Sequence, residues 1–265
     1  MSAKKNEEKR ILNCIPSRDI EKDWSETNAV QAGLQFVRKP VPTFDLRDDS
    51  WWKIGDQGST GSCVGWASTD AVLRWHLVKV GKLAKNQFLS VRFTWMASKE
   101  TDEYTSYPET FIDEVGTSLK SALTIQKNFG SVLDSLLPFS GGLVSGSEKT
   151  FFATAATRKI NSYFNLISTN NDQLTTFRNW ISHNGPILVR LDVDKTWDSV
   201  TSNGILSTYN PSSTRGGHAV ALVGYDQNQF IVRNSWGTAW GDKGYAYASN
   251  AYTLAAFTEA YGISV

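Results

Sequence analysis

The chain has 265 residues, and its 27 Lys and Arg nearly balance its 26 Asp and Glu, which gives a net charge of +1. This balance predicts no basic surface for phosphates, so nucleic acid is not an expected partner. Hydrophobic residues make up 40% of the sequence, which excludes a disordered chain, and the length fits one large domain or two small ones.

The first 43 residues are predicted to be an extension that precedes the compact part of the chain. Its charged start, MSAKKNEEKR, lacks the apolar segment of a signal peptide, and no apolar run approaches the ~18 residues of a membrane span. Two cysteines, Cys14 and Cys63, cannot form a disulfide framework, so we expect a reducing, cytoplasmic location without membrane contact. Pro40 and Pro42 favour an extended connector, and we place the domain boundary near Phe44.

The extension nevertheless carries apolar side chains that a free tail would not need. We therefore expect part of residues 13–42 to pack on the domain and to cover its cleft. These apolar residues are Ile11, Leu12, Ile15, Trp24, Leu34, Phe36 and Val37.

Helical patterns come first along the compact part. Segment 63–80 is apolar nearly all round, which predicts a buried helix that Ser62 can cap and Gly81 can end. Two further helices are predicted over 117–130 and 171–184.

Alternation with a period of two then predicts β-strands. They cover 187–193, 218–225, 229–233 and 244–249, and the second and third are joined by a short turn. The first half of the chain is thus mainly helical and the second half mainly antiparallel sheet, which is an α+β fold. Segment 139–146 (FSGGLVSG) is predicted to be a flexible loop near the junction.

Cys63 is a candidate nucleophile. It follows a Gly- and Ser-rich turn (56–62) and opens the buried helix, and a helix N-terminus favours the thiolate. The same position also suits a small buried hydrophobic residue. A phosphate-binding loop is excluded, because no Lys follows the second glycine of the turn.

His218 is the candidate partner among three histidines. His76 lies within the apolar helix and His183 near a helix end, so both are interpreted as structural or surface residues. His218 follows two glycines, which leave one side of its ring open to a cleft. Asn234 lies at the end of the next predicted strand and can come beside His218, and Trp236 can cover the pair with an apolar ring. The chain has no metal-ligand spacing, so we expect neither metal nor cofactor, and a Cys–His nucleophilic pair is the economical interpretation.

Four segments, in chain order, resemble the papain-like cysteine peptidases. They are Asp45-Leu46-Arg47, the nucleophile segment from Gln57 to Cys63, the histidine strand from Gly217 to Tyr225, and the asparagine segment from Asn234 to Tyr245. Thr60 and Val64 depart from the usual Cys-Gly-Ser/Ala-Cys-aromatic signature. The first departure removes the family's usual disulfide partner, a pattern more typical of bacterial-type members, and the extension is shorter than the family's usual prosegment.

The resemblance implies a two-lobed fold with the active-site cleft between the lobes. The expected helical lobe covers about 44–140, and its central helix starts at the catalytic cysteine. The expected β lobe covers about 150–265 as an antiparallel, β-barrel-like sheet, and residues 1–43 form a short prosegment or cleft-covering segment.

The resemblance also implies roles for individual side chains. Cys63 would be the nucleophile, His218 its acid–base partner and Asn234 the group that orients the ring, while the Gln57 amide and the Cys63 N–H would form the oxyanion hole. The residues expected to contact the substrate are Gly116, Gly217 and Trp236.

The implied reaction is peptide-bond hydrolysis through a thioester, with a protein or peptide as substrate. An acyl transferase or peptide ligase would use the same thioester, and a non-catalytic papain-like binding module is the third alternative. The extension is a candidate for self-inhibition. We expect Cys14, outside the predicted site, to serve as a reference thiol for the reactivity of Cys63.

Overall fold

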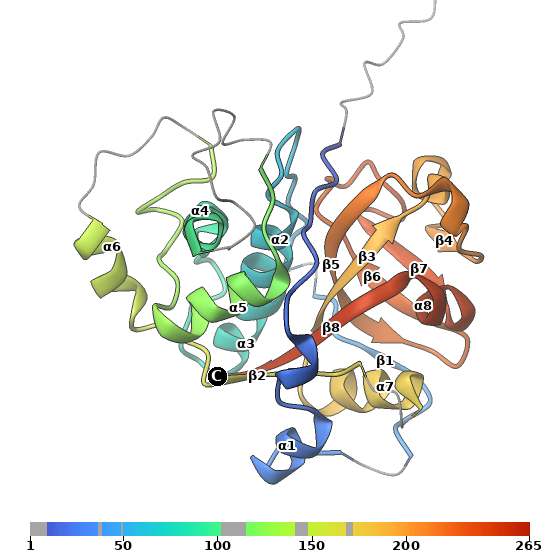
Figure 1. The fold of residues 1–265 in the computed structure, drawn as a ribbon, viewed down its shortest axis with the longest axis horizontal. Coiled ribbons are helices and arrows are strands. Elements are labelled where there is room, and N and C mark those ends of the chain that lie inside the picture. Colours follow the sequence, from blue (N-terminus) through green and yellow to red (C-terminus); the bar gives the residue numbers. More distant parts are fainter. Residues whose placement is uncertain (1–9, 37–38, 49, 102–114, 141–147, 168–171) are drawn as a thin grey trace, which may run out of the picture.

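Helices and strands gather in two lobes that lie side by side (Figure 1). The computed structural model describes residues 10–36, 39–48, 50–101, 115–140, 148–167 and 172–265. Helices form one lobe, and a large sheet with two helices packed on it forms the other, which confirms the predicted α+β class. In the part of the chain that the structure describes, no helix is long and apolar enough to cross a bilayer.

The helical lobe is organised around one buried helix that begins at Cys63. The helices of this lobe are α2 (Cys63–Gly65), α3 (Arg74–Lys79), α4 (Val91–Thr101), α5 (Leu119–Asn128) and α6 (Glu148–Ala155). A π-helical stretch, Trp66–Leu73, joins α2 to α3, so the predicted helix over 63–80 is continuous but wider in its middle. It ends before Gly81, whose φ of +73° suits a residue without a side chain.

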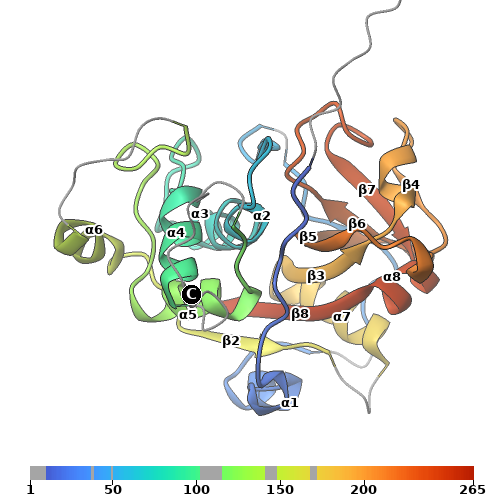
Figure 2. The ribbon, with the colours of Figure 1, turned by 45° about the horizontal axis from the view of Figure 1, so that its top comes forward.

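In the residues that the structure describes, the other lobe is an eight-stranded sheet (Figure 2). Its strands are β1 (Phe44–Asp45), β2 (Ser162–Asn165), β3 (Ile187–Val193), β4 (Ile205–Leu206), β5 (Gly216–Tyr225), β6 (Gln229–Arg233), β7 (Tyr245–Ser249) and β8 (Phe257–Ser264). They lie in the order β2-β8-β3-β5-β6-β7-β4, and β1 pairs with β5. The sheet differs from the barrel-like form expected, because the edge strands β2 and β4 do not pair with each other, and β4 runs parallel to β7.

The remaining helices lie outside the helical lobe. They are α1 (Glu26–Gln31), α7 (Gln173–His183) and α8 (Asn250–Ala256), with single 3-10 turns at Ile20–Lys22, Lys195–Ser199 and Pro211–Ser213. Asp172 caps α7 by accepting from the N–H groups of Leu174 and Thr175, near the predicted start of that helix. Of the predicted loop 139–146, residues 141–146 lie outside the described residues, as does Val37.

Strand β5 brings the two lobes together. Ala219, Ala221 and Val223 share one hydrophobic core with Cys63 and Val64. The small alanine side chains allow the central helix to approach the strand closely. This packing sets the start of the helix beside the start of β5.

The N-terminal extension runs between the lobes and then across the sheet edge (Figures 1 and 2). Asn13 forms a bridge with Gly217 of the sheet lobe, and Ile15 forms one with Ser118 of the helical lobe. Farther along, α1 lies next to β2, and its Ala29 is completely buried in the core of the sheet lobe. The extension is therefore an integrated part of the fold.

Candidate active site

The loop before Cys63 is fixed to the sheet lobe. The Gln57 N–H donates to the carbonyl of Ser235 at 2.8 Å, and Asp56 forms a bridge with Trp236. Cys63 follows at the first position of α2 and is completely buried. The thiol thus lies where the central helix meets the sheet lobe.

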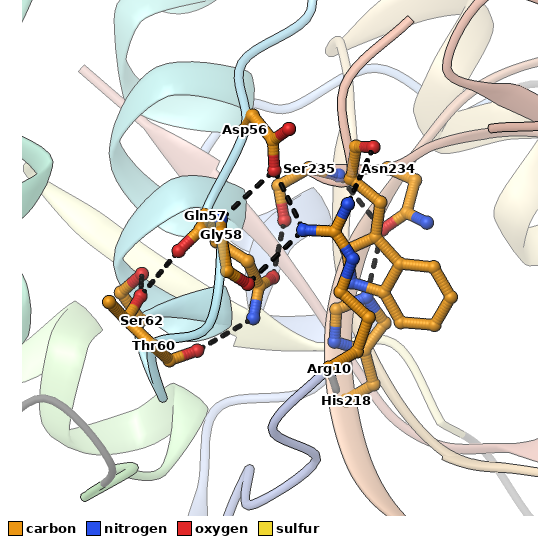
Figure 3. Close-up of polar contacts among 10 residues, drawn as sticks. Arg10, Asp56, Gln57, Gly58, Thr60, Ser62, His218, Asn234 and Ser235 are labelled. Atoms are coloured by element: carbon orange, nitrogen blue, oxygen red, sulfur yellow. Dashed lines mark hydrogen bonds and ion pairs between the residues drawn. The ribbon is translucent and has the colours of Figure 1, made fainter. Parts of the chain in front are cut away.

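His218 of β5 and Asn234, which directly follows the neighbouring strand β6, form a buried pair (Figure 3). The His218 Nε2 and Asn234 Oδ1 atoms are 2.8 Å apart. The Trp236 ring packs on His218 with 4.9 Å between centroids, and Trp197 meets the imidazole edge-on at 5.7 Å. Because these rings exclude water, the hydrogen bond can hold the imidazole in one orientation.

The Gln57 side chain is held at both ends of its amide group. Its Nε2 donates to the Thr60 carbonyl at 2.9 Å, and its Oε1 accepts from the Ser235 hydroxyl at 2.9 Å (Figure 3). A primary amide has two N–H donors, so one remains to serve an oxyanion. Ser235 was not among the predicted site residues, although it directly follows Asn234.

The charge on the Cys63 thiol depends on two neighbours. A hydrogen bond from Cys14 is the main cause that holds the pKa of Cys63 well below its usual value; burial opposes it, and His218 lowers the pKa further. Among the described residues, the His218 Nδ1 is buried without a hydrogen bond of normal geometry, and the ring lowers the pKa of Cys63 both as a hydrogen-bonding group and through its charge. Both neighbours thus favour the charged form of the Cys63 thiol.

The position of Cys14 differs from the one expected from the sequence. It was expected to be a reference thiol outside the site, but it is 2% exposed and shares a buried core with Cys63. Burial, and then the hydrogen bond and charge of Cys63, raise the pKa of Cys14 well above its usual value. The opposite directions of the two pKa shifts make Cys63 the more acidic thiol of the pair.

The glycines expected at the substrate site contact the extension. A Cβ atom on Gly116 would lie 2.0 Å from the Asn13 carbonyl oxygen, and one on Gly217 would lie 2.1 Å from the Cys14 carbonyl oxygen. The Cys14 N–H donates to the Gly217 carbonyl at 2.9 Å, and the Ile15 N–H donates to the Thr117 carbonyl at 3.1 Å. An extended stretch of the chain itself therefore lies between the two lobes, next to the core that holds Cys63.

The other two histidines lie away from this cluster. His76 is buried in the helical lobe against Trp75 and Gly185, and burial lowers its pKa to about 3. His183 is exposed at the end of α7. Both positions agree with the structural or surface roles expected for them.

Comparison with protein families assigns the chain to one of them. The model of the papain family cysteine proteases matches residues 41–261, so the chain belongs to this family, and the resemblance seen in the sequence is confirmed. It is similar to a cathepsin L-like proteinase of Fasciola hepatica, with 28% identity over 197 residues that cover 73% of this chain and 55% of the relative. The chain spans just over half the length of the curated relatives it matches first.

Solved structures of the family share the fold. Xylellain, a cysteine protease from Xylella fastidiosa, superimposes with a TM-score of 0.74 and 21% identity over 100% of this chain and 99% of its own. Digestive procathepsin L 3 of Tenebrio molitor gives a TM-score of 0.66 and 21% identity, covering 96% of this chain and 77% of its own. The predicted papain-like two-lobed architecture is thereby confirmed.

Proposed function

We propose that the protein is a cysteine peptidase and that the form described here is its latent form. The observation that carries the proposal is the convergence of Cys63, His218 and Asn234 at the junction of the two lobes, with a 2.8 Å hydrogen bond between the latter two. A binding module has no need for a buried thiolate beside an oriented imidazole. Perturbed groups of this kind are typical of catalytic sites.

In the proposed reaction, the Cys63 thiolate attacks the carbonyl carbon of a peptide bond. The second N–H of the Gln57 side chain and the Cys63 backbone N–H stabilise the oxyanion, and each such donor contributes ~3 kcal/mol at the transition state. The His218 imidazolium protonates the leaving amine, and the neutral ring then activates the water that hydrolyses the thioester. Asn234 keeps the ring directed at both steps.

The imidazole must supply most of the stabilisation of the thiolate in the open enzyme. A helix N-terminus contributes only ~0.3–2 kcal/mol, whereas a fall of the cysteine pKa from 8.5 to ~4 corresponds to roughly 6 kcal/mol. When the extension leaves, Cys63 loses its hydrogen bond from Cys14 and depends on His218 alone. A variant without His218 should therefore have an ordinary thiol.

Latency follows from the position of the extension. Cys63 is completely buried, and residues 13–15 hold hydrogen bonds on both walls of the cleft, so no peptide can reach the sulfur in this arrangement. The far end is anchored by buried carboxylates: Glu259 accepts from the Ser17 N–H at 2.9 Å, and Asp23 contacts Lys120 at 2.6 Å. Activation would require displacement of this segment, with or without its cleavage.

The experiment releases the extension from a folded chain. A recognition sequence for a site-specific protease is inserted between the exposed residues Pro42 and Thr43, and hydrolysis of a mixture of quenched peptides is measured before and after the cut. We expect turnover to rise after the cut and to be absent from Cys63→Ala. His218→Ala and Asn234→Ala should reduce it by roughly 10²-fold or more.

Two results would overturn or redirect the proposal. If the cut exposes Cys63 to alkylation but no peptide is hydrolysed, the chain is a binding module. If added amines divert the thioester to ligated products that mass spectrometry detects, and hydrolysis stays minor, the protein is an acyl transferase that uses the same residues.

A further inference from the structure

The two cysteines of the chain meet at the active site, although 49 positions separate Cys14 from Cys63 (63 − 14 = 49). They are 2% and 0% exposed and belong to the same hydrophobic core. The Cys14 N–H binds the carbonyl of Gly217, the residue before His218, and each thiol is a leading cause of the other's pKa shift, so the two side chains lie beside each other. Such proximity is the first requirement for a disulfide bond.

The backbone of Cys14 is held in place on both sides. Its N–H donates to Gly217 at 2.9 Å, and its carbonyl accepts from Arg190 Nε at 3.2 Å. Arg190 is in turn fixed by Asp192 at 2.8 Å and by the Thr258 hydroxyl at 2.9 Å. The backbone of Cys14 therefore cannot move away from Cys63 unless the whole segment leaves its place between the lobes.

We propose that Cys14 and Cys63 are a redox modification site, in which hydrogen peroxide or a related small peroxide links them by a disulfide bond that locks the extension over the nucleophile. The consequence for activity rests on the peptidase function proposed above. The bond itself does not, because two adjacent thiols suffice to form it.

The chemistry takes place in two balanced steps. The Cys63 thiolate attacks one oxygen of hydrogen peroxide, the O–O bond breaks, and the released hydroxide takes a proton to give water and a Cys63 sulfenic acid. The Cys14 sulfur then attacks the Cys63 sulfur, the S–O bond breaks, and a second water leaves. Both cysteines together lose two electrons, and the peroxide gains them.

The environment of each sulfur suits its role. The lowered pKa of Cys63 supplies the thiolate for the first step, and its charge helps to keep Cys14 protonated. Once Cys63 becomes a neutral sulfenic acid, that charge is gone, and the Cys14 thiol can ionise more easily. Local opening of the extension gives a molecule as small as peroxide access to the buried pair.

The bond would also protect the nucleophile. A sulfenic acid without a nearby thiol is oxidised further to a sulfinic acid, which ordinary thiols do not reduce. A disulfide is reversed by a dithiol reductant, whose two thiols become a disulfide while Cys14 and Cys63 regain their protons. Oxidation would thus keep the protein in a latent form that a reductant can reverse, instead of inactivating Cys63 permanently.

The test follows intact mass in the uncut, full-length protein during treatment with hydrogen peroxide. We expect a loss of about 2 Da, a linked peptide pair that contains Cys14 and Cys63, and complete recovery of both thiols with dithiothreitol. Cys14→Ser should instead gain about 32 Da on Cys63 and not recover. None of these measurements depends on peptidase activity.

A matched control moves the second thiol within the extension. In Cys14→Ser/Thr27→Cys the new thiol lies on the exposed face of α1. We expect no bond within the chain and the same irreversible oxidation as in Cys14→Ser. The proposal is overturned if wild-type Cys63 is oxidised to the sulfinic acid as fast as in Cys14→Ser, or if the control chain forms its disulfide as readily as wild type.

Discussion

Arg10 and Asp56 form an ion pair, with 2.8 Å between Nη1 and Oδ1, across 46 positions of the chain (Figure 3). Arg10 also donates to the Gly58 carbonyl at 3.1 Å and to the Trp236 carbonyl at 3.2 Å. One guanidinium thus joins the extension to the nucleophile loop and to the asparagine segment. Arg10 therefore holds the start of the extension against the residues that flank the candidate active site.

Removal of the Arg10 contacts should make Cys63 more accessible without unfolding the protein. The ion pair is partly exposed and contributes only ~0–1 kcal/mol, and each backbone hydrogen bond contributes ~1 kcal/mol. Since 1–2 kcal/mol corresponds to a factor of about 5–30, Arg10→Ala should raise the alkylation rate of Cys63 by that factor. Peptide mass spectrometry after treatment with iodoacetamide measures the rate at Cys63 separately from Cys14.

Lys22→Ala is the matched control for Arg10→Ala. Lys22 forms an exposed ion pair with Asp19 at 2.9 Å, in the same extension but away from Cys63. Its loss should leave the alkylation rate unchanged. Equal rates for Arg10→Ala and wild type would show that Arg10 does not hold the extension closed.

Gly116→Ala should displace the extension by steric contact. The added Cβ would lie 2.0 Å from the carbonyl oxygen of Asn13, and a backbone atom cannot give way as a side chain can. Overpacking of this kind costs about 1–3 kcal/mol, so we expect alkylation of Cys63 to rise by a factor of roughly 5–150. The measurement is again the alkylation rate in the uncut chain.

Gly81→Ala separates steric displacement from general destabilisation. Gly81 has a φ of +73°, and no atom lies within 4 Å of the position that an added Cβ would take, so the change strains the backbone without touching the extension. We expect a lower free energy of unfolding in urea and an unchanged alkylation rate. A Gly116→Ala rate no higher than that of Gly81→Ala would contradict the steric explanation.

Local sequence patterns were sufficient where an element depends on its own residues. Strands β3 and β6 were predicted to the residue, because alternation and flanking turn residues define them. Strand β8 was missed although Phe257, Tyr261 and Ile263 alternate, since the buried Glu259 interrupts the apolar pattern. That carboxylate is buried because it binds the extension, which no local pattern reveals.

In the site, too, residues within sequence motifs could be predicted, whereas a residue placed by long-range contacts could not. Motif spacing led to Cys63, His218, Asn234 and Gln57, whose convergence follows from the family's fold. The approach of Cys14 depends on contacts between segments that are remote in sequence, such as its backbone bond to Gly217. Its one visible signal was that it is the only other cysteine of the chain.

Asp70 should stabilise the junction of the lobes strongly. Its carboxylate lies 2.7 Å from Arg233, the residue before Asn234, and 3.6 Å from Arg74, and all three side chains are at least 90% buried. Asp70→Ala would leave two buried guanidinium groups without their counterion. We expect a loss of roughly 3–5 kcal/mol in the free energy of unfolding, measured with urea.

Asp45→Ala provides the comparison for Asp70→Ala. Asp45 pairs with Arg47 at 2.7 Å, but the two side chains are 43% and 28% exposed. Its loss should cost ~0–1 kcal/mol. If the two variants lose similar free energy, burial of the Asp70 cluster is not what stabilises the junction.

His76 should make the protein less stable in acid. Its ring is buried, and burial lowers its pKa from 6.5 to about 3, so the native state binds fewer protons than the unfolded state between these values. Its contribution to stability is therefore complete above pH 6.5 and is lost as the pH falls toward 3, by up to ~1.4 kcal/mol per pH unit.

His76→Leu should lose less free energy of unfolding over this range, because leucine does not titrate. Urea unfolding at a series of pH values measures both slopes. Parallel curves for His76→Leu and wild type would mean that another group causes the acid sensitivity.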